Sequence, residues 1–115
     1  MIREARFILP AFLPDGQQSA HHVVSDAVDK LVERFGGATV ANAYGYWKNP
    51  ENSQTVAERV FTVDVSMDDS EDARNAFIAI ATHAAIQAQQ HSVYLRFPSG
   101  EVRIPTVAPL LQEAA

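Results

Sequence analysis

Two segments of the chain carry apolar residues at the three- and four-residue spacing of an amphipathic helix. The first spans residues 19–35 and places on one stripe Ala20, Val23, Val24, Ala27, Val28, Leu31, Val32 and Phe35. Ser19 is a candidate N-cap, and Gly36-Gly37 is expected to end the helix because glycine adopts the left-handed conformation at little cost. The second helix is predicted to begin after Asp68-Asp69-Ser70, whose acidic groups suit the positive end of a helix dipole. Its stripe consists of Ala73, Phe77, Ile80, Ala81, Ala84 and Ala88.

Between and beside these helices, alternation of side chains predicts five strands. They span residues 5–13, 39–47, about 55–67, 91–97 and 102–104. The first strand is apolar on both faces, which favours a central place in the sheet, while Pro10 predicts a bulge or an early end. Residues 48–54 contain Asn49-Pro50 and Asn52-Ser53 and are expected to form the tip of a long hairpin.

The resulting order, β-α-β-β-α-β with a short terminal strand, predicts a ferredoxin-like α+β sandwich. An antiparallel sheet would carry two helices on one face, with the first and third strands central and the second at an edge. We expect one domain over residues 1–115, of which 106–115 form a tail. That tail keeps three large apolar residues, Val107, Leu110 and Leu111.

Composition narrows the possible functions only a little. The 115 residues carry a net charge of −5, with nine scattered Lys and Arg, which disfavours nucleic-acid partners. No cysteine is present, so thiolate chemistry is excluded and a cytoplasmic location is favoured. The apolar run at 7–13 is too short to span a membrane, and Pro14-Asp15-Gly16 resembles a turn rather than a signal-peptide cleavage site. No cofactor is predicted, because Gly36-Gly37 lacks the further glycine and the following helix of a phosphate-binding loop.

Polar and aromatic side chains that could carry chemistry gather on the predicted hairpin. The candidate binding residues are Tyr44, Tyr46, Trp47, Glu58 and Arg59. With the tip at 48–54, Tyr44 is expected to approach Glu58, giving an aromatic wall, a carboxylate and an anion-binding guanidinium. The alternative is that the aromatic residues pack or lie at an interface while the charges are ordinary surface groups.

The remaining titratable residues do not form a recognisable catalytic or metal-binding pattern. His21 and His22 are adjacent and diverge on a helix, and His83 has no acidic residue four positions away, so no metal site is predicted. Asp64 lies within a strand predicted to be central, on the face away from the helices. Burial there is costly without a partner, and Arg6 or Arg103 is the expected one.

Three short segments resemble a family of small uncharacterised bacterial proteins with a ferredoxin-like domain. They are "FLPDG" after the first strand, "GYW" on the second and "ERVFTVDV" on the third. The matching positions are Gly16, Gly45, Trp47, Glu58 and Arg59, within a resemblance that covers about residues 7–95. That family often carries an export or lipoprotein signal, which this chain lacks, and it has no established activity. The resemblance therefore implies the fold and marks Trp47, Glu58 and Arg59 as residues to test.

The sequence is compatible with three classes of function. The favoured one is a non-enzymatic homodimeric module that binds a protein partner or a small ligand. It is favoured because no catalytic motif is present, the first strand is apolar on both faces and the tail is apolar. No catalytic residue is assigned, so the catalytic residues stay unknown. The alternative is a cofactor-independent enzyme of the dimeric α+β barrel type, similar to small monooxygenases and isomerases, with Tyr44, Tyr46, Trp47 and His83 as its candidates. A single-stranded nucleic-acid binder is disfavoured by the acidic charge. The edge position of Tyr44, Tyr46 and Trp47 favours contact with a partner over chemistry in a closed site.

Overall fold

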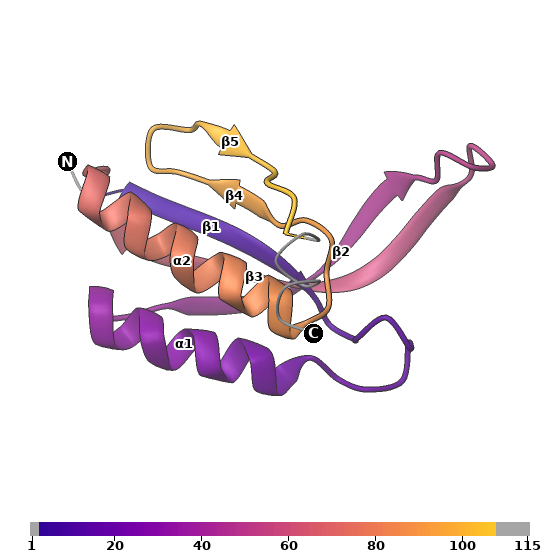
Figure 1. The fold of residues 1–115 in the computed structure, drawn as a ribbon, viewed down its shortest axis with the longest axis horizontal. Coiled ribbons are helices and arrows are strands. Elements are labelled where there is room, and N and C mark those ends of the chain that lie inside the picture. Colours follow the sequence, from indigo (N-terminus) through magenta and orange to yellow (C-terminus); the bar gives the residue numbers. More distant parts are fainter. Residues whose placement is uncertain (1–2, 108–115) are drawn as a thin grey trace.

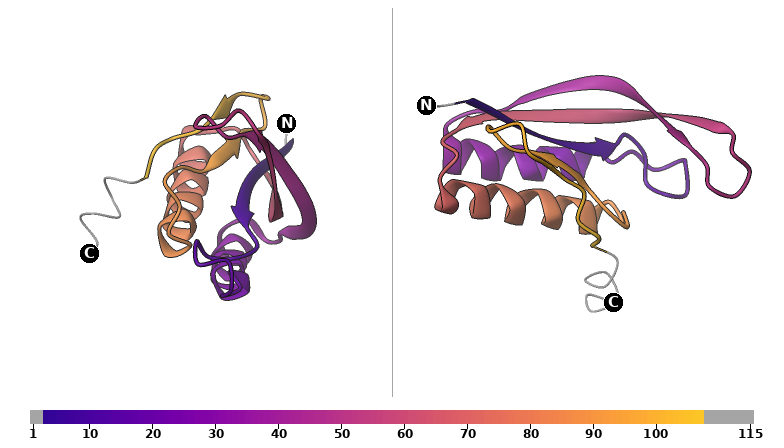
Figure 2. Two further views of the ribbon diagram at one scale, coloured as in Figure 1. Left: turned by 90° about the vertical axis from the view of Figure 1, so that its right-hand side faces the viewer. Right: turned by 90° about the horizontal axis from the view of Figure 1, so that it is seen from above.

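The computed structural model describes residues 3–107 as an antiparallel sheet with two helices on one face (Figures 1 and 2). The elements in chain order are β1 (Arg3–Pro10), α1 (His21–Phe35), β2 (Thr39–Lys48), β3 (Thr55–Met67), α2 (Glu71–Gln87), β4 (Tyr94–Arg96) and β5 (Val102–Arg103). The sheet order is β2-β3-β1-β4-β5. The ferredoxin-like α+β prediction is therefore confirmed, with β1 and β3 central and β2 at an edge.

The core fills the space between the sheet and the helices. Phe77 of α2 lies at its centre, with ring centroids 5.8 Å from Phe7 of β1 and 6.0 Å from Phe97 after β4. All three rings are fully buried. In the strands, Phe7 lies opposite Val63 and Leu95, so one alternating set of side chains from three strands faces the helices.

The helix ends follow the predicted chemistry, with one exception. Ser70 caps α2 by accepting a hydrogen bond from the Ala73 N–H at 3.2 Å, and Gly36 ends α1 at φ 93°. The prediction that Ser19 is the N-cap residue of α1 is wrong by one position, because the N-cap is Ala20; the Ser19 Oγ still accepts a hydrogen bond from the His21 N–H at 3.1 Å. Ser19 instead forms a β-bridge with Phe12, which keeps it outside the helix.

Three strands are shorter than predicted, and β5 is so by one residue. β1 ends at Pro10, where the ring removes a ladder donor, which agrees with the expected early end. β4 covers only Tyr94–Arg96, because the segment before it pairs with the chain near Thr106 through the Ser92–Thr106 bridge. In the predicted tail, Val107 is buried, while Leu110 and Leu111 lie outside the described residues.

β2 and β3 form a hairpin whose outer part extends beyond the helices, as both figures show. We call its outer part, residues 43–59, the arm. Its tip is 49–54, one residue shorter than expected, because Lys48 still pairs with Thr55. The expected approach of Tyr44 to Glu58 is therefore wrong by one position: Tyr44 lies opposite Arg59, and Gly45 lies opposite Glu58.

The sheet face away from the helices holds a polar pair at its centre. Arg6 of β1 donates two hydrogen bonds to Asp64 of β3, from Nε at 2.7 Å and from Nη2 at 3.0 Å. This hydrogen bonding raises the pKa of Arg6 above its ordinary value. Arg6 is thus the partner expected for Asp64. Neither helix within residues 3–107 has the length and apolar character needed to cross a bilayer.

Candidate functional site

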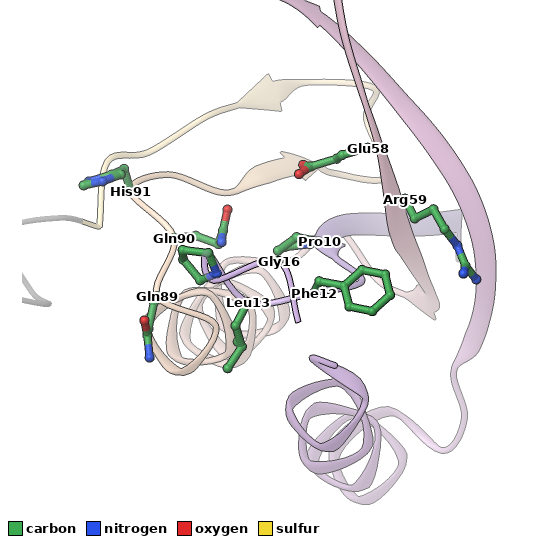
Figure 3. Close-up of a pocket in the computed structure, with 10 residues that line it drawn as sticks. Pro10, Phe12, Leu13, Gly16, Glu58, Arg59, Gln89, Gln90 and His91 are labelled. Atoms are coloured by element: carbon green, nitrogen blue, oxygen red, sulfur yellow. The ribbon is translucent and has the colours of Figure 1, made fainter. Parts of the chain in front are cut away.

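A cavity of about 520 Å³ lies at the end of the sandwich where β1 stops (Figure 3). Its lining comes from three segments that are far apart in the sequence: the end of β1 with the loop that follows it, the first half of β3 and the chain after α2. The lining residues are Pro10, Phe12, Leu13, Pro14, Gly16, Glu58, Arg59, Gln89, Gln90 and His91. This volume falls within the range of about 300–1,000 Å³ that is usual for small-molecule sites.

The first wall is a loop, residues 11–20, held by backbone hydrogen bonds. The Ala11 N–H donates to the Arg59 carbonyl at 2.9 Å, and the Ala20 N–H donates to the Ala11 carbonyl at 2.8 Å. Farther out, the Leu13 N–H donates to the Gln18 carbonyl at 2.8 Å. These bonds fasten the loop to β3 and to itself, so its side chains reach the cavity from a fixed backbone.

Asp15 closes the tip of this loop. Its Oδ1 accepts hydrogen bonds from the N–H groups of Gln18 and Gln17, each at 2.9 Å. These bonds favour the charged carboxylate and lower the pKa of Asp15. Gly16 follows with φ 73°, a conformation in which residues with a Cβ are strained. The turn predicted from Pro14-Asp15-Gly16 is present. The Asp15 carboxylate is engaged in hydrogen bonds within this turn.

The second wall is the chain that leaves α2. Gln89 has φ 59°, a left-handed conformation that is uncommon for a residue other than glycine. It directs the chain so that the Gln90 N–H donates to the Ala85 carbonyl at 2.9 Å, and the Gln90 side-chain amide donates to the Ala88 carbonyl at 3.1 Å. Gln90 is therefore a fixed polar group at this side of the cavity.

Glu58 supplies the carboxylate of the site. Figure 3 shows its side chain pointing from β3 toward the side of the cavity formed by Gln90 and His91. The side chain reaches solvent, yet nearby protein atoms reduce its hydration and raise the pKa of Glu58 above its ordinary value. Across residues 3–107 no hydrogen bond or ion pair to this carboxylate is found, and Gly45 opposite it contributes no side chain.

The other predicted binding residues lie elsewhere. Arg59 lines the cavity beside its backbone, but Figure 3 shows its guanidinium pointing away from Glu58, since neighbours on a strand face opposite sides. The aromatic residues of the arm do not line the cavity. Tyr44, Tyr46 and Trp47 have exposed fractions of 65%, 69% and 44%. The structure thus brings Glu58 into a site and leaves the three aromatic residues on an open strand.

Sequence reasoning missed the residues on the other two walls. Phe12 was assigned to the first strand, and Gln89 and Gln90 fell between the predicted second helix and the strand at 91–97. Phe12 carried a usable signal, because it follows Pro10, after which the alternation of a regular strand cannot be assumed. Gln89 and Gln90 carried none, since a left-handed glutamine at a helix end has no sequence marker.

The histidines and acidic residues do not gather around a possible ion. Among the described residues no group of three His, Asp or Glu side chains is placed to bind a metal. His21 packs edge-on to Phe61 with centroids 6.5 Å apart, and His83 is exposed on α2. His91 borders the cavity and is exposed.

Comparison with solved structures finds the same fold in a phage SAM lyase. The structure of that enzyme in complex with S-methyl-5′-thioadenosine aligns with a TM-score of 0.70 at 19% identity, covering 90% of this chain and 88% of the other. Its apo state aligns with a TM-score of 0.68 at 19% identity, covering 90% and 87%. At this identity the likeness establishes the fold. No protein-family model and no curated protein sequence matches the chain, so the resemblance to the bacterial family named above stays a prediction.

This comparison contradicts the functional prediction made from the sequence. A non-enzymatic homodimeric module was favoured because no catalytic motif was visible. Both structures that share this fold, however, are of an enzyme, and the alignment covers most of its chain. The alternative of a monooxygenase-like or isomerase-like barrel fails as well, since none of Tyr44, Tyr46, Trp47 and His83 lines the cavity. Isolated residues on separate segments form no sequence motif, so the missing motif was weak evidence against an enzyme.

Proposed function

We propose that this protein is an enzyme that cleaves S-adenosylmethionine, a sulfonium nucleoside, to S-methyl-5′-thioadenosine. The observation that carries the proposal is the unpaired, partly desolvated carboxylate of Glu58 in a cavity of about 520 Å³. The shared fold with a SAM lyase supports the choice of substrate. A carboxylate with no partner in the described chain suits a ligand that brings a positive charge.

S-adenosylmethionine carries two positive charges, on the sulfonium sulfur and on the α-ammonium group, and the reaction determines which of them Glu58 can bind. When the bond between the sulfonium sulfur and the methionine γ-carbon breaks, the electron pair goes to sulfur, which becomes a neutral thioether. A carboxylate close to sulfur would stabilise the charged ground state more than the transition state and would slow the reaction. We therefore assign Glu58 to the α-ammonium group of the substrate, whose charge does not change.

The apolar part of the cavity would assist the same step. Pro10 and Leu13 are buried residues at this wall. Loss of the sulfonium charge is favoured where water is excluded, because the reactant is the more strongly hydrated state. As the bond breaks, either the substrate's own carboxylate oxygen attacks the γ-carbon and closes a lactone, or a water molecule removes a proton from the β-carbon and a double bond forms between the β- and γ-carbons. Proton NMR of the four-carbon product distinguishes these two outcomes.

The test is incubation of the purified protein with S-adenosylmethionine, followed by chromatography of the nucleoside products. We expect S-methyl-5′-thioadenosine from the wild type, and at least a tenfold loss of kcat/KM in Glu58→Gln. Glu51→Gln at the hairpin tip serves as the matched control and is expected to retain activity. If the wild type forms no S-methyl-5′-thioadenosine, or if Glu58→Gln is as active as the wild type, the assignment is wrong.

We also propose that the protein associates with a second copy through the edge strand β2. Support comes from Tyr44, Tyr46 and Trp47, three large aromatic side chains exposed on a strand with a free edge. Light scattering should report a mass above one chain, and Trp47→Ser should lower it. A strictly monomeric wild type at high concentration would contradict this proposal and leave the first one standing.

A further inference from the structure

Phe12 is the exposed member of the six phenylalanines, with 39% of its surface accessible. Its two neighbours are buried, Ala11 at 4% and Leu13 at 9%. The ring makes no aromatic contact with any residue of the described range, and it lies outside the core cluster. A single exposed apolar residue is common in proteins, so exposure alone indicates nothing. Two further features distinguish this ring.

The first feature is the rigidity of its backbone. Ala11 on one side is hydrogen-bonded to Arg59, and Leu13 on the other side is hydrogen-bonded to Gln18. Phe12 itself pairs with Ser19 in an isolated β-bridge. The ring is therefore presented from a backbone that is fixed before any ligand arrives, which reduces the entropy lost on binding.

The second feature is its position in the cavity. Figure 3 shows the Phe12 ring on the Arg59 side of Pro10, whereas Glu58 and Gln90 extend toward the other side. One end of the cavity thus carries the Phe12 ring next to Arg59, and the other end carries the Glu58 carboxylate and the Gln90 amide. A nucleoside with a charged tail has the same division, because its purine presents flat π faces and its tail carries an ammonium group.

We infer that Phe12 is the specificity-determining residue for the purine, whose face stacks on its ring while the tail extends toward Glu58. The inference rests on the proposed function, since it places the same substrate in the same cavity. Stacking of a base on an aromatic ring contributes about 1–3 kcal/mol, which corresponds to roughly 5- to 150-fold in affinity. Phe12 is thereby distinguished from Glu58, which acts on the tail.

The test compares two ligands across matched variants. Calorimetry should show that Phe12→Leu, which keeps an apolar side chain but loses the π face, binds both S-methyl-5′-thioadenosine and adenosine at least fivefold more weakly. Phe12→Trp should bind both at least as well as the wild type. Tyr46→Leu makes the same chemical change on the exposed arm and should bind like the wild type. Glu58→Gln should weaken S-adenosylmethionine far more than the neutral S-methyl-5′-thioadenosine.

A spectroscopic signal separates stacking from a general loss of structure. The ultraviolet absorption band of the purine should lose intensity on binding to the wild type and to Phe12→Trp, and should change much less on binding to Phe12→Leu. If the wild type binds S-methyl-5′-thioadenosine and Phe12→Leu binds it equally well, the assignment of Phe12 is overturned and the proposed function stands. If the wild type binds neither S-adenosylmethionine nor S-methyl-5′-thioadenosine, both are overturned.

Discussion

The two ends of β3 show how one strand can serve two purposes. Its second half, which contains Val63, Val65 and Met67, is buried between β1 and β2 beneath the helices. Its first half pairs with β2 alone, in the arm, and its residues up to Arg59 are almost all exposed. Glu58 lies close to the change from one environment to the other. The buried half defines the fold, and the point where burial ends provides a carboxylate with reduced hydration and no partner among residues 3–107.

The largest difference between the two regions is expected in stability. Phe77→Ala removes the ring that contacts Phe7 and Phe97 and should lower the free energy of unfolding by about 3–5 kcal/mol. Tyr46→Ala on the arm should change it by less than about 0.5 kcal/mol. Urea denaturation followed by circular dichroism measures both. Similar losses for the two variants would mean that the arm is part of the cooperative core.

The next largest effect is expected at the Arg6–Asp64 pair on the open sheet face. Asp64→Ala leaves a half-buried guanidinium without its bidentate acceptor, directly across the sheet from Arg96. We expect the free energy of unfolding to fall by about 1–3 kcal/mol, because a partly buried polar group loses its hydrogen bonds. The double variant Arg6→Ala/Asp64→Ala provides the control. Strictly additive single effects in this cycle would show that the pair is not coupled.

The ionised Glu58 carboxylate is expected to lower the free energy of unfolding at neutral pH, although the proposed activity depends on it. A raised folded-state pKa means that the folded protein binds the proton more tightly, so the contribution of Glu58 to stability is largest below its ordinary pKa and falls as the pH rises through the folded pKa. Glu58→Gln should remove this fall and melt slightly higher than the wild type at neutral pH. Thermal melts from acid to neutral pH measure the effect. A variant that is both less stable and less active would indicate a structural role.

The pKa of Glu58 also predicts how catalysis responds to pH. Only the ionised carboxylate attracts an ammonium group, so KM for S-adenosylmethionine should rise as the pH falls through the raised pKa. Glu58→Gln should lack this inflection. KM measured over the acid range tests the prediction, and an identical inflection in the variant would assign it to another group.

The smallest effect is expected at the closed end of the 11–20 loop. Asp15→Asn keeps the shape of the side chain but weakens its two backbone hydrogen bonds by removing the charge. Because the site is fully solvated, the melting temperature should hardly change, while the amide protons of Gln17 and Gln18 should exchange faster. Hydrogen exchange followed by NMR detects this. Unchanged exchange at both amides would mean that the carboxylate does not hold the turn.

Sequence patterns predicted the fold well because buried apolar side chains recur at a regular spacing along each helix and strand. The period of α1, the alternation in β3 and the capping serine of α2 each depend on neighbours that are close in sequence. The partner of Asp64 was also predictable, since a charge on a central strand requires one. The hairpin register was wrong by one residue because the tip closes through Lys48 and Thr55, and the side-chain bonds of Asn49 and Asn52 within the tip cannot be counted in advance.

The candidate site was predictable only in part. Glu58 was identified by its chemistry, but its cavity depends on where β1 stops and on how Gln89 turns the chain after α2. Those two segments are about 80 residues apart and carry no pattern that links them. The aromatic residues of the arm drew attention because they are large and close together in sequence. Their exposure shows that proximity along a strand is a weaker guide to a site than convergence of separate segments.

The most direct measurement is an NMR titration of the isotopically labelled protein with S-methyl-5′-thioadenosine, which locates the ligand without requiring turnover. We predict that amide shifts change in three separate segments, around Phe12, Glu58 and Gln90, while those of Tyr44, Tyr46 and Trp47 change little. Shift changes confined to the arm, or no changes at ligand concentrations in the millimolar range, would contradict it.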